Sequence, residues 1–80
     1  MVHWREVLNN IVTRNHLEIR SDTTQHGPEN DARWHVTYSL KVQRENYMVI
    51  GQGYTTTKLG SREEAAMHAV AWLQAHNYRE

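Results

Sequence analysis

Residues 33–42 read RWHVTYSLKV, and nearly every second side chain in this stretch is apolar. Trp34, Val36, Tyr38, Leu40 and Val42 alternate there with polar residues. A period of two residues is typical of a strand with one buried face. Polar residues on the other face fit an antiparallel sheet that is covered on one side only. We therefore expect helices from other parts of the chain to cover the apolar face.

The segment before this strand begins with a helical pattern. Apolar residues recur through residues 4–12 at the three- and four-residue spacing of one helical face, which predicts a helix over residues 2–14. Leu17 and Ile19 then alternate with charged residues. This alternation predicts a short strand at a sheet edge, and its signal fades over residues 21–24.

The segments that flank the central strand are a loop and a hairpin. Residues 25–32 contain the only proline among polar and chain-breaking residues, which indicates an exposed loop. Residues 43–46 are polar and suit a hairpin turn. The following run of β-branched and aromatic residues predicts a third strand that can continue through Gly51 and Gly53.

The last segment has a second helical pattern, made largely of small residues. Its buried stripe is expected at Ala65, Ala69 and Leu73. Ser61 with Glu64 three residues later has the pattern of a capping box, which predicts that this helix begins at Ser61. We expect the helix to fray near Asn77.

The order helix, strand, strand, strand, helix predicts an α+β fold in one domain over residues 1–80. In this fold, α-β-β-β-α, a three-stranded antiparallel sheet carries both helices on one face. The chain has no cysteine, so we expect no disulfide and an intracellular location, in the cytoplasm or the nucleus. No apolar run is long enough to span a bilayer, so no membrane association is expected. Nine basic and nine acidic residues give zero formal charge, which argues against a strong basic field.

Four short motifs occur in a recognisable order. They are LNN at residues 8–10, GPEN at 27–30, GQG at 51–53 and SREEAA at 61–66. They resemble the Leu-Asn-Glu, Gly-Pro-x-His, Gly-x-Gly and Ser-Lys-Lys-x-Ala-Lys motifs of double-stranded-RNA-binding domains. Trp34 is similar to the aromatic residue that follows the loop in that family. The resemblance extends over residues 4–75.

The resemblance implies a partner, double-stranded RNA, recognised largely by shape. Family members span about 16 base pairs of an A-form duplex, contacting two minor grooves and the phosphates between them. The positions that match the family's contacts are Asn10, Thr13 and Arg14 in the first helix, Pro28, Glu29 and Asn30 in the loop, and Ser61 and Arg62 at the second helix. Asn10 and Asn30 replace a glutamate and a histidine, but an amide can still donate and accept hydrogen bonds.

The second helix has fewer cations than the family pattern. Arg62 keeps one positive charge, whereas Glu63 and Ala66 stand where the family has lysines. Residues 54–60 form an insertion, because the family has a single residue between its glycine motif and its serine. Lys58 in this insertion is expected to restore a phosphate contact.

Two functions remain open from the sequence. One is binding of double-stranded RNA with moderate or low affinity. The other is a protein-interaction or dimerisation module on the same fold, which the zero net charge and the acidic second helix favour. A basic strip that joins Arg14, Lys58 and Arg62 would favour RNA, and a neutral apolar patch would favour a protein partner.

The sequence indicates no catalytic residue, metal site or cofactor. The histidines are His3, His16, His26, His35, His68 and His76. They are scattered over different elements and lack a ligand spacing such as His-x-x-x-His. The glycines at 51 and 53 are too few to indicate a phosphate-binding loop. We therefore expect a protein that is not an enzyme.

Overall fold

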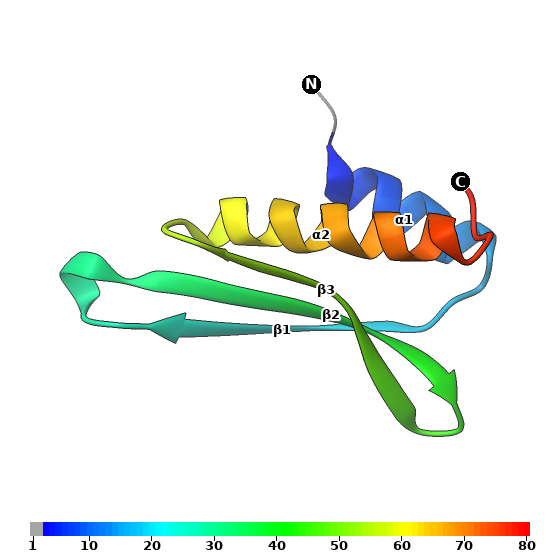
Figure 1. Ribbon diagram of the computed structural model, residues 1–80, viewed down its shortest axis with the longest axis horizontal. Coiled ribbons are helices and arrows are strands. Elements are labelled where there is room, and N and C mark those ends of the chain that lie inside the picture. Colours follow the sequence, from blue (N-terminus) through cyan, green and yellow to red (C-terminus); the bar gives the residue numbers. More distant parts are fainter. Residues whose placement is uncertain (1–2) are drawn as a thin grey trace.

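The computed structural model describes residues 3–80 and has the predicted order of elements (Figure 1). The elements are α1 (Trp4–Arg14), β1 (Ile19–His26), β2 (Arg33–Gln43), β3 (Asn46–Thr55) and α2 (Lys58–Ala75). A one-turn 3-10 helix, η1 (Glu29–Asp31), lies between β1 and β2. The α+β class and the α-β-β-β-α order are confirmed. Val2, which the sequence placed in the first helix, lies outside the described residues.

β2 is the central strand of an antiparallel sheet with the order β1-β2-β3. The alternation predicted for it is confirmed over the first part of the strand, where Val36 and Leu40 are buried on the side of the helices and Trp34 and Tyr38 are half-buried on that side. It is wrong at two positions: Ser39, expected to face water, is only 5% exposed, and Val42, expected on the buried face, is 50% exposed. The pairing with β3 shifts after Tyr38 and again after Lys41, which interrupts the period of two residues. The strand that the sequence pattern marked as central is therefore central in the structure.

β1 is longer than the sequence predicts. It has eight residues and pairs with β2 along its whole length, from Ile19 opposite Leu40 to His26 opposite Arg33. All of its side chains except that of Ile19 are exposed. Hydrogen bonds between backbones hold the second half of β1, and they leave no hydrophobic signal in the sequence. Gln25 and His26, predicted to lie in the loop, therefore belong to the strand.

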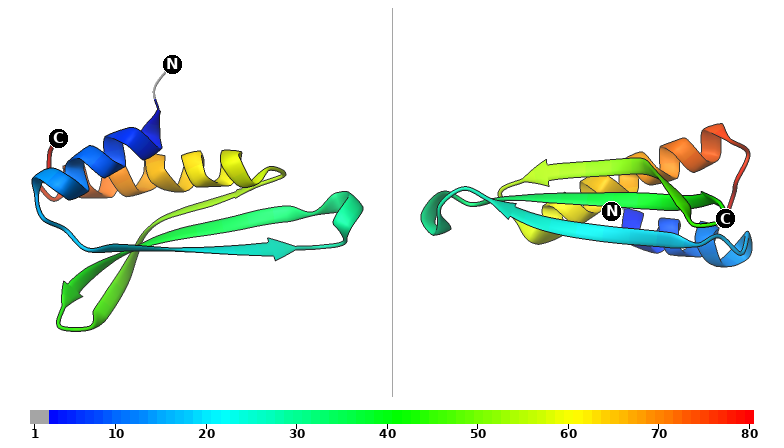
Figure 2. Two further views of the ribbon diagram at one scale, coloured as in Figure 1. Left: turned by 180° about the vertical axis from the view of Figure 1, so that it is seen from behind. Right: turned by 90° about the horizontal axis from the view of Figure 1, so that it is seen from below.

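Both helices lie on one face of the sheet, as predicted (Figures 1 and 2). α2 packs directly on β3, and only glycines stand between their backbones at Gly51 and Gly53. A Cβ atom on Gly51 would lie 2.6 Å from the backbone nitrogen of Ala69, and one on Gly53 would lie 2.8 Å from that of Ala65. Side chains do not tolerate such distances, so the absence of side chains on β3 sets how closely α2 approaches.

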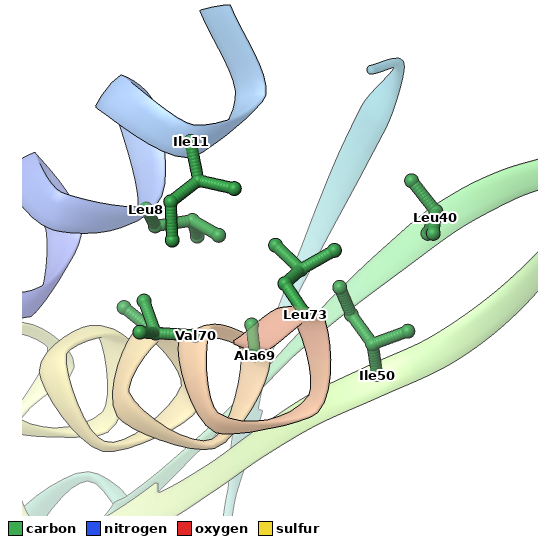
Figure 3. Close-up of a cluster of buried hydrophobic side chains, with 8 residues drawn as sticks. Leu8, Ile11, Leu40, Ile50, Ala69, Val70 and Leu73 are labelled. Carbon is green, nitrogen blue, oxygen red and sulfur yellow. The ribbon is translucent and has the colours of Figure 1, made fainter. Parts of the chain in front are cut away.

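α1 packs mainly against α2 (Figure 3). The buried cluster that joins the helices and the sheet consists of Leu8, Ile11, Leu40, Ile50, Ala66, Ala69, Val70 and Leu73. Because α1 leans on α2, it leaves a cleft of about 670 Å³ toward the sheet, with Val12, Ile19 and Tyr38 among its lining residues. The side of β1 that faces the helices is consequently open to solvent beyond Ile19.

A β-bulge bends the hairpin formed by β2 and β3. The pairing passes from Tyr38 opposite Gly51 to Ser39 opposite Val49, so Ile50 is an extra residue in β3. The bulge allows the consecutive residues Ile50 and Gly51 both to be buried. Beyond it the hairpin turns away from the helices (Figure 1). The apolar residues exposed in this part are Val42, Met48 and Val49.

The β2–β3 turn and the C-terminal end of α2 both lie close to their predicted positions. The β2–β3 turn consists of Arg44 and Glu45, inside the predicted range 43–46. α2 ends at Ala75, just before Asn77, where fraying was predicted. Arg44 and Asn77 both have left-handed backbone conformations, with φ of 51° and 70°. Single residues of this kind commonly end regular elements.

Ala69 is the residue that best tests the close contact between α2 and β3. It is fully buried, so Ala69→Leu should lower the free energy of unfolding by about 1 to 3 kcal/mol through overpacking. Ala71 is exposed on the same helix, and Ala71→Leu should change it by no more than about 0.5 kcal/mol. Urea denaturation measures both variants. Equal stability of the two would contradict the contact described above.

Candidate nucleic-acid interface

α2 begins one turn earlier than the sequence predicts. Its N-cap is Thr57, whose hydroxyl accepts a hydrogen bond from the backbone N–H of Gly60 at 3.0 Å. Lys58 is the first helical residue rather than part of a loop. The predicted capping box of Ser61 and Glu64 is therefore wrong, because Thr57 already caps the helix upstream.

Ser61 is fully buried and joins α2 to the sheet. Its hydroxyl oxygen lies 2.7 Å from the carbonyl oxygen of Trp34 and accepts a hydrogen bond from the backbone N–H of Thr55 at 3.0 Å. A serine fits here because its small side chain satisfies buried polar groups on two strands. The side chain of Ser61 has this structural role, so we do not include it among the surface contacts.

Lys58 and Arg62 are the cations at the start of α2. They are four residues apart and so lie on the same side of the helix. The ammonium nitrogen of Lys58 lies 5.6 Å from the centre of the Trp34 ring, within the range of a cation–π interaction. The salt bridges within residues 3–80 join Arg20 to Asp22 and Lys41 to Glu18. Neither Lys58 nor Arg62 belongs to a salt bridge within these residues.

Unlike Lys58 and Arg62, Lys41 on the sheet is paired with a carboxylate. The Nζ atom of Lys41 lies 3.0 Å from the carboxylate of Glu18. This hydrogen bond and the attraction between the two charges raise the pKa of Lys41. Lys41 thus remains a cation whose charge is balanced within the protein.

The loop between β1 and β2 lies at the same end of the molecule as the start of α2 (Figures 1 and 2). Pro28, Glu29 and Asn30 are all exposed in it. η1 closes the loop with a hydrogen bond of 2.9 Å from the N–H of Asp31 to the carbonyl oxygen of Pro28. Asn30 can present its amide to a ligand, but Glu29 and Asp31 give the loop a negative charge.

α1, which carries the three residues predicted on the first helix, ends toward the opposite end of the molecule from this loop (Figure 1). Asn10, Thr13 and Arg14 are exposed, and Asn10 donates a hydrogen bond of 3.0 Å to the carboxylate of Glu80. Asn10 and Asn15 donate hydrogen bonds to Glu80 and Arg79, which follow the C-terminal end of α2, so Arg14 does not form one continuous strip with the cations at the start of that helix. The structure instead separates the predicted residues into two groups.

Two glutamates of α2 form hydrogen bonds to other elements, although their negative charges would repel a phosphate. Glu63 accepts a hydrogen bond of 2.9 Å from the backbone N–H of Trp4, the first residue of α1. Glu64 accepts one of 3.0 Å from the backbone N–H of Tyr54, in the edge strand β3. Glu63 thus stabilises the N-terminus of α1, where free N–H groups favour an anion. Neither role has a local signal in the sequence, because both partners belong to other elements.

Residues 3–80 contain neither a metal-binding cluster nor a membrane-spanning helix. Within that range no three or more side chains of His, Cys, Asp and Glu are arranged to hold a metal ion. Within the same range no helix has the length and apolar character needed to cross a membrane. The cleft beside α1 contains His3, Arg5, Glu6 and Glu63 in addition to apolar side chains. Neither known protein-family models nor curated proteins match this chain.

The hydrogen bond from Trp4 to Glu63 should contribute measurably to stability. Replacing Glu63 by alanine leaves the N-terminus of α1 without this acceptor and should cost about 0.5 to 2 kcal/mol. Glu63→Gln keeps a carbonyl oxygen and should cost less than half as much, since only the charge is lost. Urea denaturation of the two variants makes the comparison, and equal losses would mean that the hydrogen bond does not contribute.

Proposed function

We propose that this protein binds double-stranded RNA by shape and backbone contacts, without catalysis. The observation that carries the proposal is that Lys58 and Arg62 form no salt bridge within residues 3–80 and belong to the start of α2, which lies toward the same end of this α-β-β-β-α fold as the β1–β2 loop. Arg14 is the last residue of α1, and α1 ends toward the other end of the molecule. These are the regions that the resemblance to double-stranded-RNA-binding domains assigns to RNA contacts.

The length of the molecule supports this mode of binding. Groups at both ends of a body 40 Å long can reach successive minor grooves on one side of a duplex. The start of α2 would then contact phosphates next to the groove that the β1–β2 loop reaches. Lys58 and Arg62 supply positive side chains there, and the first N–H groups of the helix add a partial positive charge.

The small number of free cations limits the expected affinity. With Arg14, Lys58 and Arg62 as phosphate contacts, we expect the logarithm of the binding constant to fall with the logarithm of salt concentration with a slope corresponding to roughly two to four contacts. The remaining specificity for RNA depends on amides such as Asn10 and Asn30, which can hydrogen-bond to 2′-hydroxyl groups.

A protein-interaction or dimerisation module is the second candidate function. The exposed apolar residues Val42, Met48 and Val49 at the bent hairpin favour it, as does the zero net charge. These residues are at a distance from the start of α2 (Figure 1). The two functions can therefore be separated by substitution.

A titration distinguishes RNA binding from non-specific attraction. A duplex RNA of about 20 base pairs should bind more tightly than duplex DNA or single-stranded RNA of equal length, at two salt concentrations. The 2′-hydroxyl contacts are the reason for the difference. Equal affinity for duplex RNA and duplex DNA would mean that these contacts are not made, and no binding to any of the three would favour the protein-interaction module.

Substitution of the two cations locates the interface. Lys58→Gln or Arg62→Gln should weaken binding of duplex RNA roughly fivefold to tenfold near 0.1 M salt and make the salt dependence shallower by about one contact. Arg44→Gln is the matched control, because Arg44 is an exposed cation in the β2–β3 turn, away from α2. If all three variants bind equally, the start of α2 is not the RNA site.

A further inference from the structure

The face of the sheet opposite the helices has a cluster of three aromatic rings. They belong to His26 of β1, His35 of β2 and Tyr54 of β3, one from each strand. The ring centres of the two histidines are 6.0 Å apart, and Tyr54 lies 6.0 Å from His26 and 6.2 Å from His35. The proposed RNA contacts do not use this cluster.

The register of β1 and β2 brings the two histidines together. His26 pairs with Arg33, and His35 pairs with Thr24, so the histidines are diagonal neighbours on one face. The loop between the strands separates them in sequence. A search for ligand spacings along the chain cannot find such a pair.

A hydrogen bond orients the ring of His35. Its Nε2 atom lies 3.0 Å from the side-chain carbonyl oxygen of Gln52 in β3. In the tautomer that donates from Nε2 to this oxygen, Nδ1 keeps a free electron pair. Histidines that bind metal ions commonly donate their other ring N–H to an oxygen in this way.

We propose that His26 and His35 bind a divalent transition-metal ion of the zinc type. With tetrahedral angles and metal–nitrogen bonds of about 2.0 to 2.1 Å, two imidazoles that bind one zinc ion hold their ring centres roughly 5 Å apart. The observed separation of 6.0 Å is close to this value, and the rings must approach each other slightly to bind the ion. His26 is exposed and His35 is half-buried, so small rotations of the side chains can complete the geometry.

The site is open, and water supplies the other ligands. Within residues 3–80 no third His, Cys, Asp or Glu is arranged to join the pair. Imidazole nitrogens prefer zinc, copper and nickel over magnesium and calcium, which prefer oxygen ligands. The ion would connect β1 to β2 directly before Gly27, where the β1–β2 loop begins. It would stabilise the pairing at the end of β1, where the exposed side chains contribute little burial to the stability of the strand.

Calorimetric titration of the protein with zinc chloride tests the site. His26→Ala and His35→Ala should each weaken zinc binding at least tenfold, because one ligand alone remains. His68→Ala is the control and should bind zinc like the parent, since His68 is exposed on α2. Magnesium chloride should give no binding. Absence of zinc binding by the parent at millimolar zinc, or equal binding by all variants, would overturn the proposal.

Amide hydrogen exchange gives a second, local readout. Zinc should slow exchange at residues 25–31 of the parent, because the ion would restrain opening of this end of β1. The effect should be absent in His26→Ala. Far-UV circular dichroism checks that the variants keep the fold. Zinc-dependent protection that persists in His26→Ala would place the ion elsewhere and overturn the assignment.

Discussion

The structure depends on how closely α2 can approach β3. Gly51 and Gly53 present backbone, without a side chain, to Ala65 and Ala69 on the helix. This approach buries Ser61 completely, where its hydroxyl contacts both β2 and β3. Larger residues at these positions would lift the helix and leave polar groups of the strands without partners. The contact therefore determines the rotation and the start of α2 together.

The position of α2 determines in turn which of its charges face outward. Glu63 and Glu64 accept hydrogen bonds from α1 and from the edge strand β3. The carboxylate of Glu63 thereby links α1 to α2. The carboxylate of Glu64 occupies a backbone N–H of an edge strand, where unpaired groups can pair with other chains. Lys58 and Arg62 have no such internal partner in the described part of the chain. The acidic residues Glu63 and Glu64 of α2 thus form contacts within the domain, whereas Lys58 and Arg62 form no salt bridge in the described residues.

The sheet separates two surfaces with different chemistry. The side of the helices contains the cations and the amides of the proposed RNA interface, whereas the opposite side contains the histidine pair and Tyr54. β1 is common to both surfaces, because it leads into the loop with Asn30. It is also the strand with the least side-chain burial. An ion that restrains β1 would consequently affect the order of this loop.

The sequence by itself determined the elements whose signal is local. The alternation around Val36 and the stripe around Leu8 and Ile11 predicted the central strand and α1, because burial of one face imposes a period of two or of 3.6 residues. The glycines of β3 were correctly read as part of a strand. These patterns sufficed for the α-β-β-β-α order and for most boundaries.

Only the tertiary structure decided the features that depend on distant partners. The full length of β1 follows from backbone pairing, which does not depend on the identity of its exposed side chains. The burial of Ser61 and the bond from Trp4 to Glu63 join segments far apart in sequence. The approach of His26 to His35 depends on the register of β1 and β2. A local pattern cannot report such contacts, because the spacing of residues along the chain does not reveal which strands and helices become neighbours.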